Sequence, residues 1–181
     1  MSDSITVIEC DKKTSNRIPV LNFFSIISKL IFFPGEFYRG LSREEGYTSA
    51  VVFLFLCSFI YSILAGFLVI QNKLLFTLIL FLNSFFFPFI TALFLYFSTM
   101  ILCRRAFSYQ RLFGITAYAN VTLLGAWIPG MTWIVGLLNF YLIGFGMVKV
   151  GRISGFKSFM CLVITGAILL LLIHLLYNPS L

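Results

Sequence analysis

Long apolar runs without any charge dominate this sequence, and they limit the folds that it can adopt. The clearest of them extends from Thr48 to Ile70. Of the 181 residues, 60% are hydrophobic and only 10% are charged, whereas about a quarter are charged in a typical soluble domain. A chain of this size cannot hide so much apolar surface from water. We therefore predict an all-α fold, a polytopic membrane helical bundle.

The apolar runs predict about five transmembrane helices, within a membrane domain at residues 48–178. A hydrocarbon core of about 30 Å needs about 20 helical residues, and the third run is the weakest of the five. Pro88, near the middle of the second run, removes a backbone donor and is expected to bend its helix. The expected bounds are Thr48 to Ile70, Leu74 to Leu102, Leu112 to Ile128, Met131 to Val148 and Ser158 to Tyr177.

Two segments precede the first predicted crossing. Residues 1–17 predict a flexible cytoplasmic tail, and residues 18–47 predict an interfacial helix followed by a polar cytoplasmic segment. Polar residues three and four apart in residues 18–33 form one stripe on a helix. This run is short for a crossing, which would also bury Lys29 at a cost of about 2.5–3.5 kcal/mol. We predict an in-plane amphipathic helix, and a short buried span is the alternative.

Basic residues are distributed unevenly between the predicted loops. All six acidic residues precede residue 46, so later bases supply the net charge of +7. With five crossings and a cytoplasmic N-terminus, all 13 Lys and Arg residues except Lys73 lie on the cytoplasmic side. Because basic residues collect on that side, we predict this orientation, with the C-terminus on the far side. The bases stand between apolar runs, so nucleic acid is not an expected partner.

The bases form candidate contacts at the cytoplasmic face. The loops at residues 103–111 and 149–157 carry no acid, and each base beside an anionic leaflet contributes about 1 kcal/mol of attraction. The expected partners are anionic lipid headgroups and a protein on the cytoplasmic side, and an oligomer is compatible with the sequence. The candidate residues are Lys29, Arg104, Arg105, Arg111, Lys149, Arg152 and Lys157.

Groups for catalysis or for ion coupling are scarce in the apolar part of the chain. No acidic residue follows Glu45, and His174 is the single histidine. Ion-coupled transporters keep an acidic residue near the midplane, and acid–base or metal chemistry needs clustered carboxylates or histidines. We therefore expect no enzymatic activity, no cofactor and no metal site.

Neutral polar residues are expected in the bundle interior. They either join helices, at about 0.6 kcal/mol per contact, or form a polar path or headgroup cleft around Pro88, Asn120 and Asn139. The residues assigned to this interior are Asn83, Ser84, Thr91, Ser98, Thr99, Thr116, Asn120, Thr122, Thr132 and Asn139.

The order of these features resembles the Yip family, five-span proteins known as partners of Ypt/Rab-type GTPases. The segment FFPGEFYRGL at residues 32–41 and the C-terminal half at residues 108–159 carry the resemblance. In that half, the matching features are Ala117-Tyr118-Ala119, Ile128-Pro129, Trp133, the stretch from Tyr141 to Gly146, and Ile153-Ser154 with Lys157. The short N-terminal arm and the lack of an Asp-Leu-Tyr-Gly-Pro segment resemble bacterial members.

The resemblance implies a cytosolic N-terminus, a C-terminus on the opposite side and no enzymatic activity. We expect a non-enzymatic scaffold or adaptor that engages lipid or protein partners at its cytoplasmic face. The expected location is a bacterial inner membrane, or an ER or Golgi membrane in a eukaryote. The alternative function is a transporter or channel for a small solute or lipid, without a carboxylate-coupled ion.

Overall fold

The fold is built from helices alone in the part of the chain that can be described. The computed structural model describes residues 19–44, 47–68, 73–103, 107–128 and 130–177, and every regular element in these ranges is a helix. The all-α prediction is therefore confirmed. The predicted tail at residues 1–17 lies outside the described residues.

Four helices in the described ranges are long and apolar enough to cross a membrane. They are α3 (Tyr47–Phe67), α4 (Lys73–Cys103), α7 (Thr132–Gly151) and α8 (Gly155–Tyr177). They correspond to the first, second, fourth and fifth predicted crossings. The predicted loop at residues 149–157 is wrong, because α7 and α8 continue into it and leave only residues 152–154 between them.

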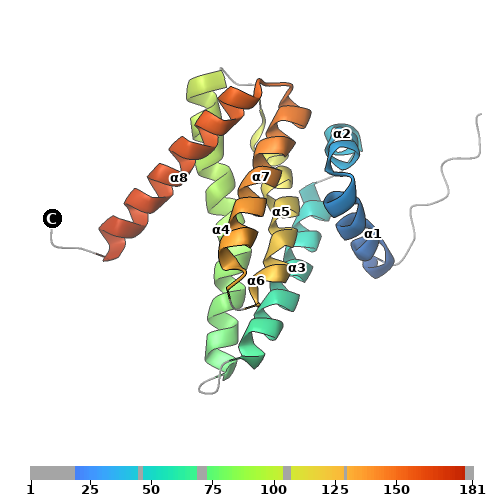
Figure 1. The fold of residues 1–181 in the computed structure, drawn as a ribbon, viewed down its shortest axis with the longest axis vertical. Coiled ribbons are helices and arrows are strands. Elements are labelled where there is room, and N and C mark those ends of the chain that lie inside the picture. Colours follow the sequence, from blue (N-terminus) through green and yellow to red (C-terminus); the bar gives the residue numbers. More distant parts are fainter. Residues whose placement is uncertain (1–18, 45–46, 69–72, 104–106, 129, 178–181) are drawn as a thin grey trace, which may run out of the picture.

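The third predicted crossing is divided among three short helices at the centre of the bundle. These are α5 (Tyr109–Ala119), the 3₁₀ helix η1 (Asn120–Thr122) and α6 (Leu123–Ala126). Helix α5 packs against α2, α3, α4 and α7, so it is enclosed by other helices (Figure 1). Because of the 3₁₀ segment, this region contains no single helix of crossing length, and the count of five is not confirmed.

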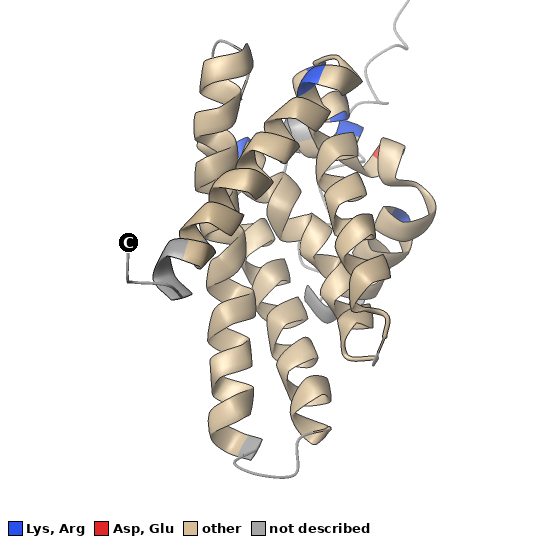
Figure 2. Ribbon diagram, turned by 60° about the vertical axis from the view of Figure 1, so that its left-hand side comes forward, with Lys and Arg blue, Asp and Glu red and all other residues tan. Residues whose placement is uncertain are grey.

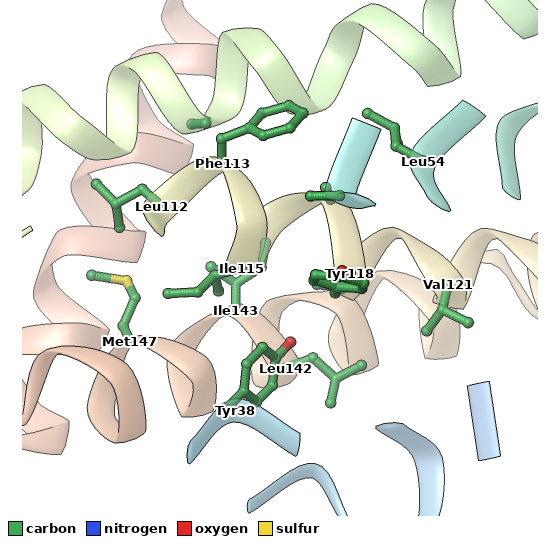
Figure 3. Close-up of a cluster of buried hydrophobic side chains, with 14 of the residues drawn as sticks. Tyr38, Leu54, Leu112, Phe113, Ile115, Tyr118, Val121, Leu142, Ile143 and Met147 are labelled. Atoms are coloured by element: carbon green, nitrogen blue, oxygen red, sulfur yellow. The ribbon is translucent and has the colours of Figure 1, made fainter. Parts of the chain in front are cut away.

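The hydrophobic core is centred on α5. Every residue from Leu112 to Ala119 is buried, and Figure 3 shows the α5 side chains among those of the neighbouring helices. The ring centroid of Phe113 lies 4.5 Å from that of Phe89 on α4. The Tyr118 ring lies 5.0 Å from Phe53 of α3. These contacts tie the central helix to its neighbours on several sides.

Two short helices at the N-terminal side pack beside the bundle. They are α1 (Pro19–Phe32) and α2 (Pro34–Glu44), joined at Phe33. Proline lacks a backbone N–H and is favoured at the first position of a helix, so Pro34 ends α1 and begins α2. Residues 34–44 were predicted only as a polar segment, and this expectation is corrected.

Helix α2 is amphipathic and lies across the bundle. It is seen nearly end-on in Figure 1, whereas the long helices run up the page. Phe37, Tyr38 and Leu41 lie on the side that packs toward the core, while Glu36 and Arg39 are exposed. Helix α1 also buries Phe23 and Leu30 but exposes Phe24 and Ile31.

Candidate functional site: a basic end and a polar cavity

The described basic residues other than Lys73, which begins α4, lie toward one end of the bundle. Figure 2 shows them in the half of the molecule that contains α2 and the turn between α7 and α8. Arg111 is in the first turn of α5, Lys149 in the last turn of α7 and Lys157 in the first turn of α8. The predicted contacts Arg104 and Arg105 lie outside the described residues.

The side chains of these bases are available at the surface to different degrees. Lys29, Arg111, Arg152 and Lys157 are exposed, and Lys149 is half-buried. The Nζ atom of Lys149 lies 5.3 Å from the ring centroid of Phe145, a cation–π contact worth about 0.5–1 kcal/mol when exposed. Among the described side chains, Glu36 is the one acid, so this end of the molecule is positive.

Arg152 occupies an unusual backbone conformation at the end of α7. Its φ of 50° and ψ of 32° are left-handed, a region that costs a residue with a Cβ roughly 1–2 kcal/mol. The conformation ends α7 and lets the chain reverse into α8 within three residues. The reversal brings Lys149, Arg152 and Lys157 to the same end of the bundle.

Helix α2 joins this basic end to the core. Gly146 of α7 allows the approach, since a Cβ added there would lie 2.7 Å from Ile115 and 3.0 Å from the Tyr38 ring. Tyr38 is fully buried, and its hydroxyl has no hydrogen-bond partner. Burial raises the pKa of the Tyr38 phenol well above its ordinary value.

The sequence contained a signal for α2 that charge alone concealed. Residues 34–47 were classified as polar because of their charged residues, but Phe37, Tyr38 and Leu41 recur at the spacing of one helix face. Pro34 at the start and Glu36 in the first turn are also typical of a helix N-terminus. The helical period was therefore the informative feature.

A cavity with a mainly apolar lining and a few polar groups lies between α4, α5, α7 and α8, away from the basic end. It has a volume of about 280 Å³, and Pro88, Asn120 and Asn139 all line it. The structure thus brings together the three residues that the sequence analysis grouped. The lining also includes Thr91, Thr116, Gly136, Phe140, Ile143, Leu162, Thr165 and Gly166.

Asn120 compensates for the proline in α4. Pro88 has no N–H to donate to the carbonyl four residues earlier, which is that of Ser84. The Nδ2 atom of Asn120 donates to this Ser84 oxygen at 3.4 Å. Ser84 and Asn120 therefore form an interhelical contact between α4 and η1.

Asn139 differs from Asn120 in lacking a partner for its oxygen. It lies on α7, and its Oδ1 atom is buried without a hydrogen bond. A buried acceptor left unpaired costs about 1–3 kcal/mol. Asn139 is therefore the lining residue with unused hydrogen-bonding capacity.

Hydroxyl and thiol groups hold the first half of α8 to the bundle. The hydroxyls of Ser98 and Thr165 lie 2.9 Å apart, and Ser158 Oγ donates to the Gly144 carbonyl at 2.9 Å. Cys161 Sγ donates to the Ser98 carbonyl at 3.9 Å. Beyond Thr165, α8 diverges from the bundle (Figure 1) and exposes Leu170 and Leu171.

Two residues assigned to the polar interior are in fact exposed. Asn83 on α4 and Thr132 at the start of α7 both face outward. The prediction failed because α4 is apolar on all sides, so its sequence does not indicate which face packs inward. Ser84, one residue further along, is buried instead.

The four long apolar helices are compatible with an integral, multi-pass membrane protein. Comparisons of the chain with protein-family models, with curated proteins and with solved structures find no match.

Proposed function

We propose that this protein is a non-enzymatic membrane scaffold or adaptor whose basic end engages anionic lipid headgroups or a protein partner in the cytoplasm. The observation that carries the proposal is the position of the described Lys and Arg residues other than Lys73 toward one end of the bundle, beside the amphipathic α2. A positive surface at the level of the headgroups attracts anionic lipids and acidic protein surfaces. No catalytic group is needed for such a role.

The proposal includes a fifth crossing formed by α5, η1 and α6. These helices follow one another without a gap over residues 109–126, about 27 Å at 1.5 Å per residue. That length is close to the hydrocarbon thickness of about 30 Å. Irregular backbone at membrane depth is tolerated where protein surrounds it, and Asn120, Val121 and Thr122 of η1 are buried.

The basic end faces the cytoplasm in this proposal. Lys and Arg accumulate in cytoplasmic loops, and five alternating crossings then put the C-terminus on the opposite side. The same arrangement is what the Yip-family resemblance implies, and membership of that family, as a bacterial-type protein of the inner membrane, is part of the proposal. Helix α2 would lie in the plane of the membrane surface, with its charged face toward water.

A transport function has weaker support. Its candidate path was the polar group at Pro88, Asn120 and Asn139, but Asn120 already bonds to the Ser84 carbonyl. The cavity that these residues line is about 280 Å³, smaller than the 300–1,000 Å³ typical of small-molecule sites.

Lipid retention tests the proposed role. The purified protein is placed in nanodiscs of phosphatidylcholine and phosphatidylglycerol, and the lipids retained after extraction are measured by mass spectrometry. We expect enrichment of phosphatidylglycerol, lost when Arg111, Lys149, Arg152 and Lys157 are all replaced by Gln. Lys73→Gln, at the start of α4, is the control and should retain the enrichment. No enrichment in the wild type, with solute flux in liposomes, would overturn the proposal in favour of transport.

A further inference from the structure

We infer that the cavity between α4, α5, α7 and α8 binds the hydroxyl group of a neutral membrane lipid, with Asn139 as the residue that recognises it. This site is separate from the basic end, and the inference does not depend on which partner that end engages. It depends on the hydrogen-bonding state of the lining residues, on the absence of charge among them and on the way α8 leaves the bundle.

Most hydrogen-bonding groups of the lining are already paired, and the Asn139 amide is the exception. The hydroxyl of Thr91 donates to the Phe87 carbonyl at 2.9 Å, and that of Thr116 donates to the Phe113 carbonyl at 2.9 Å. Asn120 Nδ2 donates to the Ser84 carbonyl. Each of these donors is therefore already used, whereas Asn139 Oδ1 accepts nothing. A ligand group that donates to this oxygen complements such a lining, and a group that can also accept matches the whole amide.

The absence of charged residues from the lining further restricts the chemical class of the ligand. The lining residues include no acid and no base. A phosphate headgroup would have no cation beside it and an ammonium group no carboxylate, so either would be buried at high cost. Once charged headgroups are excluded, a neutral hydroxyl group is the ligand group that fits. A hydroxyl both donates and accepts hydrogen bonds, so it can pair with either end of the Asn139 amide.

The position of the cavity makes it reachable from the lipid. Gly136 and Phe140 of α7 are exposed at its edge, and Gly166 and Leu169 of α8 are half-buried where that helix diverges. Asn139 lies about 10 Å along α7 from its start at Thr132, at 1.5 Å per residue. The Oδ1 atom is covered by its surroundings. The terminal torsion of asparagine is soft, so binding would require a rotation that brings the oxygen to the cavity.

The size of the cavity fits part of a lipid. At about 280 Å³ it is far larger than a single water requires but lies below the usual range for a whole ligand. It therefore accommodates the hydroxyl-bearing end and the beginning of one chain. The apolar residues Phe87, Ile143, Leu162 and Leu169 would contact that chain.

Photo-crosslinking in nanodiscs tests this inference. The probe is a diacylglycerol that carries a diazirine near the glycerol end of one chain, compared with its methyl ether, which lacks the hydroxyl donor. We expect the diacylglycerol to label residues around the cavity roughly two- to tenfold more than the ether, the effect of one hydrogen bond. Equal labelling by the two probes, the result if only water occupies the cavity, would overturn the inference.

Matched variants test whether the preference for the diacylglycerol depends on Asn139. Asn139→Leu should abolish the preference for the diacylglycerol, whereas Asn83→Leu changes the same residue type on the exposed face of α4 and should preserve it. Gly166→Val adds bulk at the lining of the cavity, at a position where an added Cβ meets nothing within 4 Å, and it should reduce labelling by both probes. A preference that survives in Asn139→Leu, or that Asn83→Leu also removes, would contradict the assignment.

Discussion

Helices α4 and α5 run beside each other and are built in opposite ways. Helix α4 is 31 residues long and mainly apolar, and it exposes many large apolar side chains, among them Leu74 at 84% and Ile101 at 79%. Helix α5 has 11 residues, which include glycine, threonine, alanine and tyrosine. Every residue from Leu112 to Ala119 is nevertheless buried.

If the protein spans a membrane as proposed, the difference means that apolarity in this chain marks contact with lipid rather than depth in the bundle. A lipid-facing helix must be apolar on its outer surface, because the hydrocarbon offers no partner to a polar group. A helix surrounded by protein can carry small residues and hydroxyls, because its neighbours supply close packing and hydrogen bonds. Thr116 shows this, since its hydroxyl donates to the Phe113 carbonyl inside the bundle.

The largest expected effect comes from emptying the core around α5. Phe113→Ala removes a fully buried ring that contacts Phe89 and Tyr47, and we expect a loss of about 3–5 kcal/mol in the free energy of unfolding. Phe97→Ala removes a ring of α4 that is 50% exposed and should cost less than about 1 kcal/mol. Unfolding by detergent titration measures both, and equal losses would contradict the contrast between the two helices.

A smaller loss is expected where α2 and α5 meet α7. The Cβ of Gly146→Ala would press on Ile115 and Tyr38, which are both fully buried, so we expect a loss of about 1–3 kcal/mol. Gly136→Ala on the same helix meets nothing within 4 Å and gains helix propensity. If Gly146→Ala were as stable as Gly136→Ala in the same titration, the close packing of α2 on α7 would be wrong.

The polar contacts of α8 should contribute still less to the free energy of unfolding. The Ser98–Thr165 contact joins α4 to α8, and a double-mutant cycle with Ser98→Ala and Thr165→Val should give a coupling energy of about 0.6 kcal/mol. Ser98→Ala paired with Thr91→Val is the control, because the Thr91 hydroxyl bonds within its own helix. Equal coupling in the two pairs would argue against a direct bridge.

The smallest effect at neutral pH is expected for Tyr38→Phe. The Tyr38 hydroxyl has no partner, so its removal should leave stability unchanged or raise it by up to about 1 kcal/mol. Burial raises the pKa of this phenol above its ordinary value of 10.0. The phenol therefore stays protonated when folded but ionises when unfolded, and stability falls as the pH rises above about 10.

Unfolding measured from pH 8 to pH 11 checks this expectation. Tyr38→Phe should lose less stability than the wild type over that range, and Tyr141→Phe, at an exposed position on α7, is the control. An equal alkaline loss in the wild type and in Tyr38→Phe would show that Tyr38 is not buried as a neutral phenol.

Much of the fold could be predicted because long, uncharged apolar runs indicate helices of crossing length. The runs that became α3, α4, α7 and α8 were identified for this reason. Helix α2 was missed, because its charged residues drew attention away from the spacing of Phe37, Tyr38 and Leu41. The break at η1 was also missed, since a 3₁₀ segment depends on how the surrounding helices pack.

The candidate cavity could be predicted in part. Pro88, Asn120 and Asn139 were grouped correctly, as polar or helix-perturbing residues in apolar runs. Their separate roles could not be predicted, because the bond from Asn120 to the Ser84 carbonyl depends on the register between α4 and η1. The register of α4 against its neighbours also could not be predicted, and for this reason Asn83 was assigned to the bundle interior, although the adjacent Ser84 is the buried residue.

The number of crossings is the central claim, and the location of the two termini tests it most directly. Reporter domains that are active on only one side of the membrane are fused before Met1 and, in a second protein, after Leu181. Five crossings, with α5, η1 and α6 together forming the third, predict a cytoplasmic N-terminus and a C-terminus on the far side. If both reporters are active on the same side, the enclosed segment does not cross and the account is contradicted.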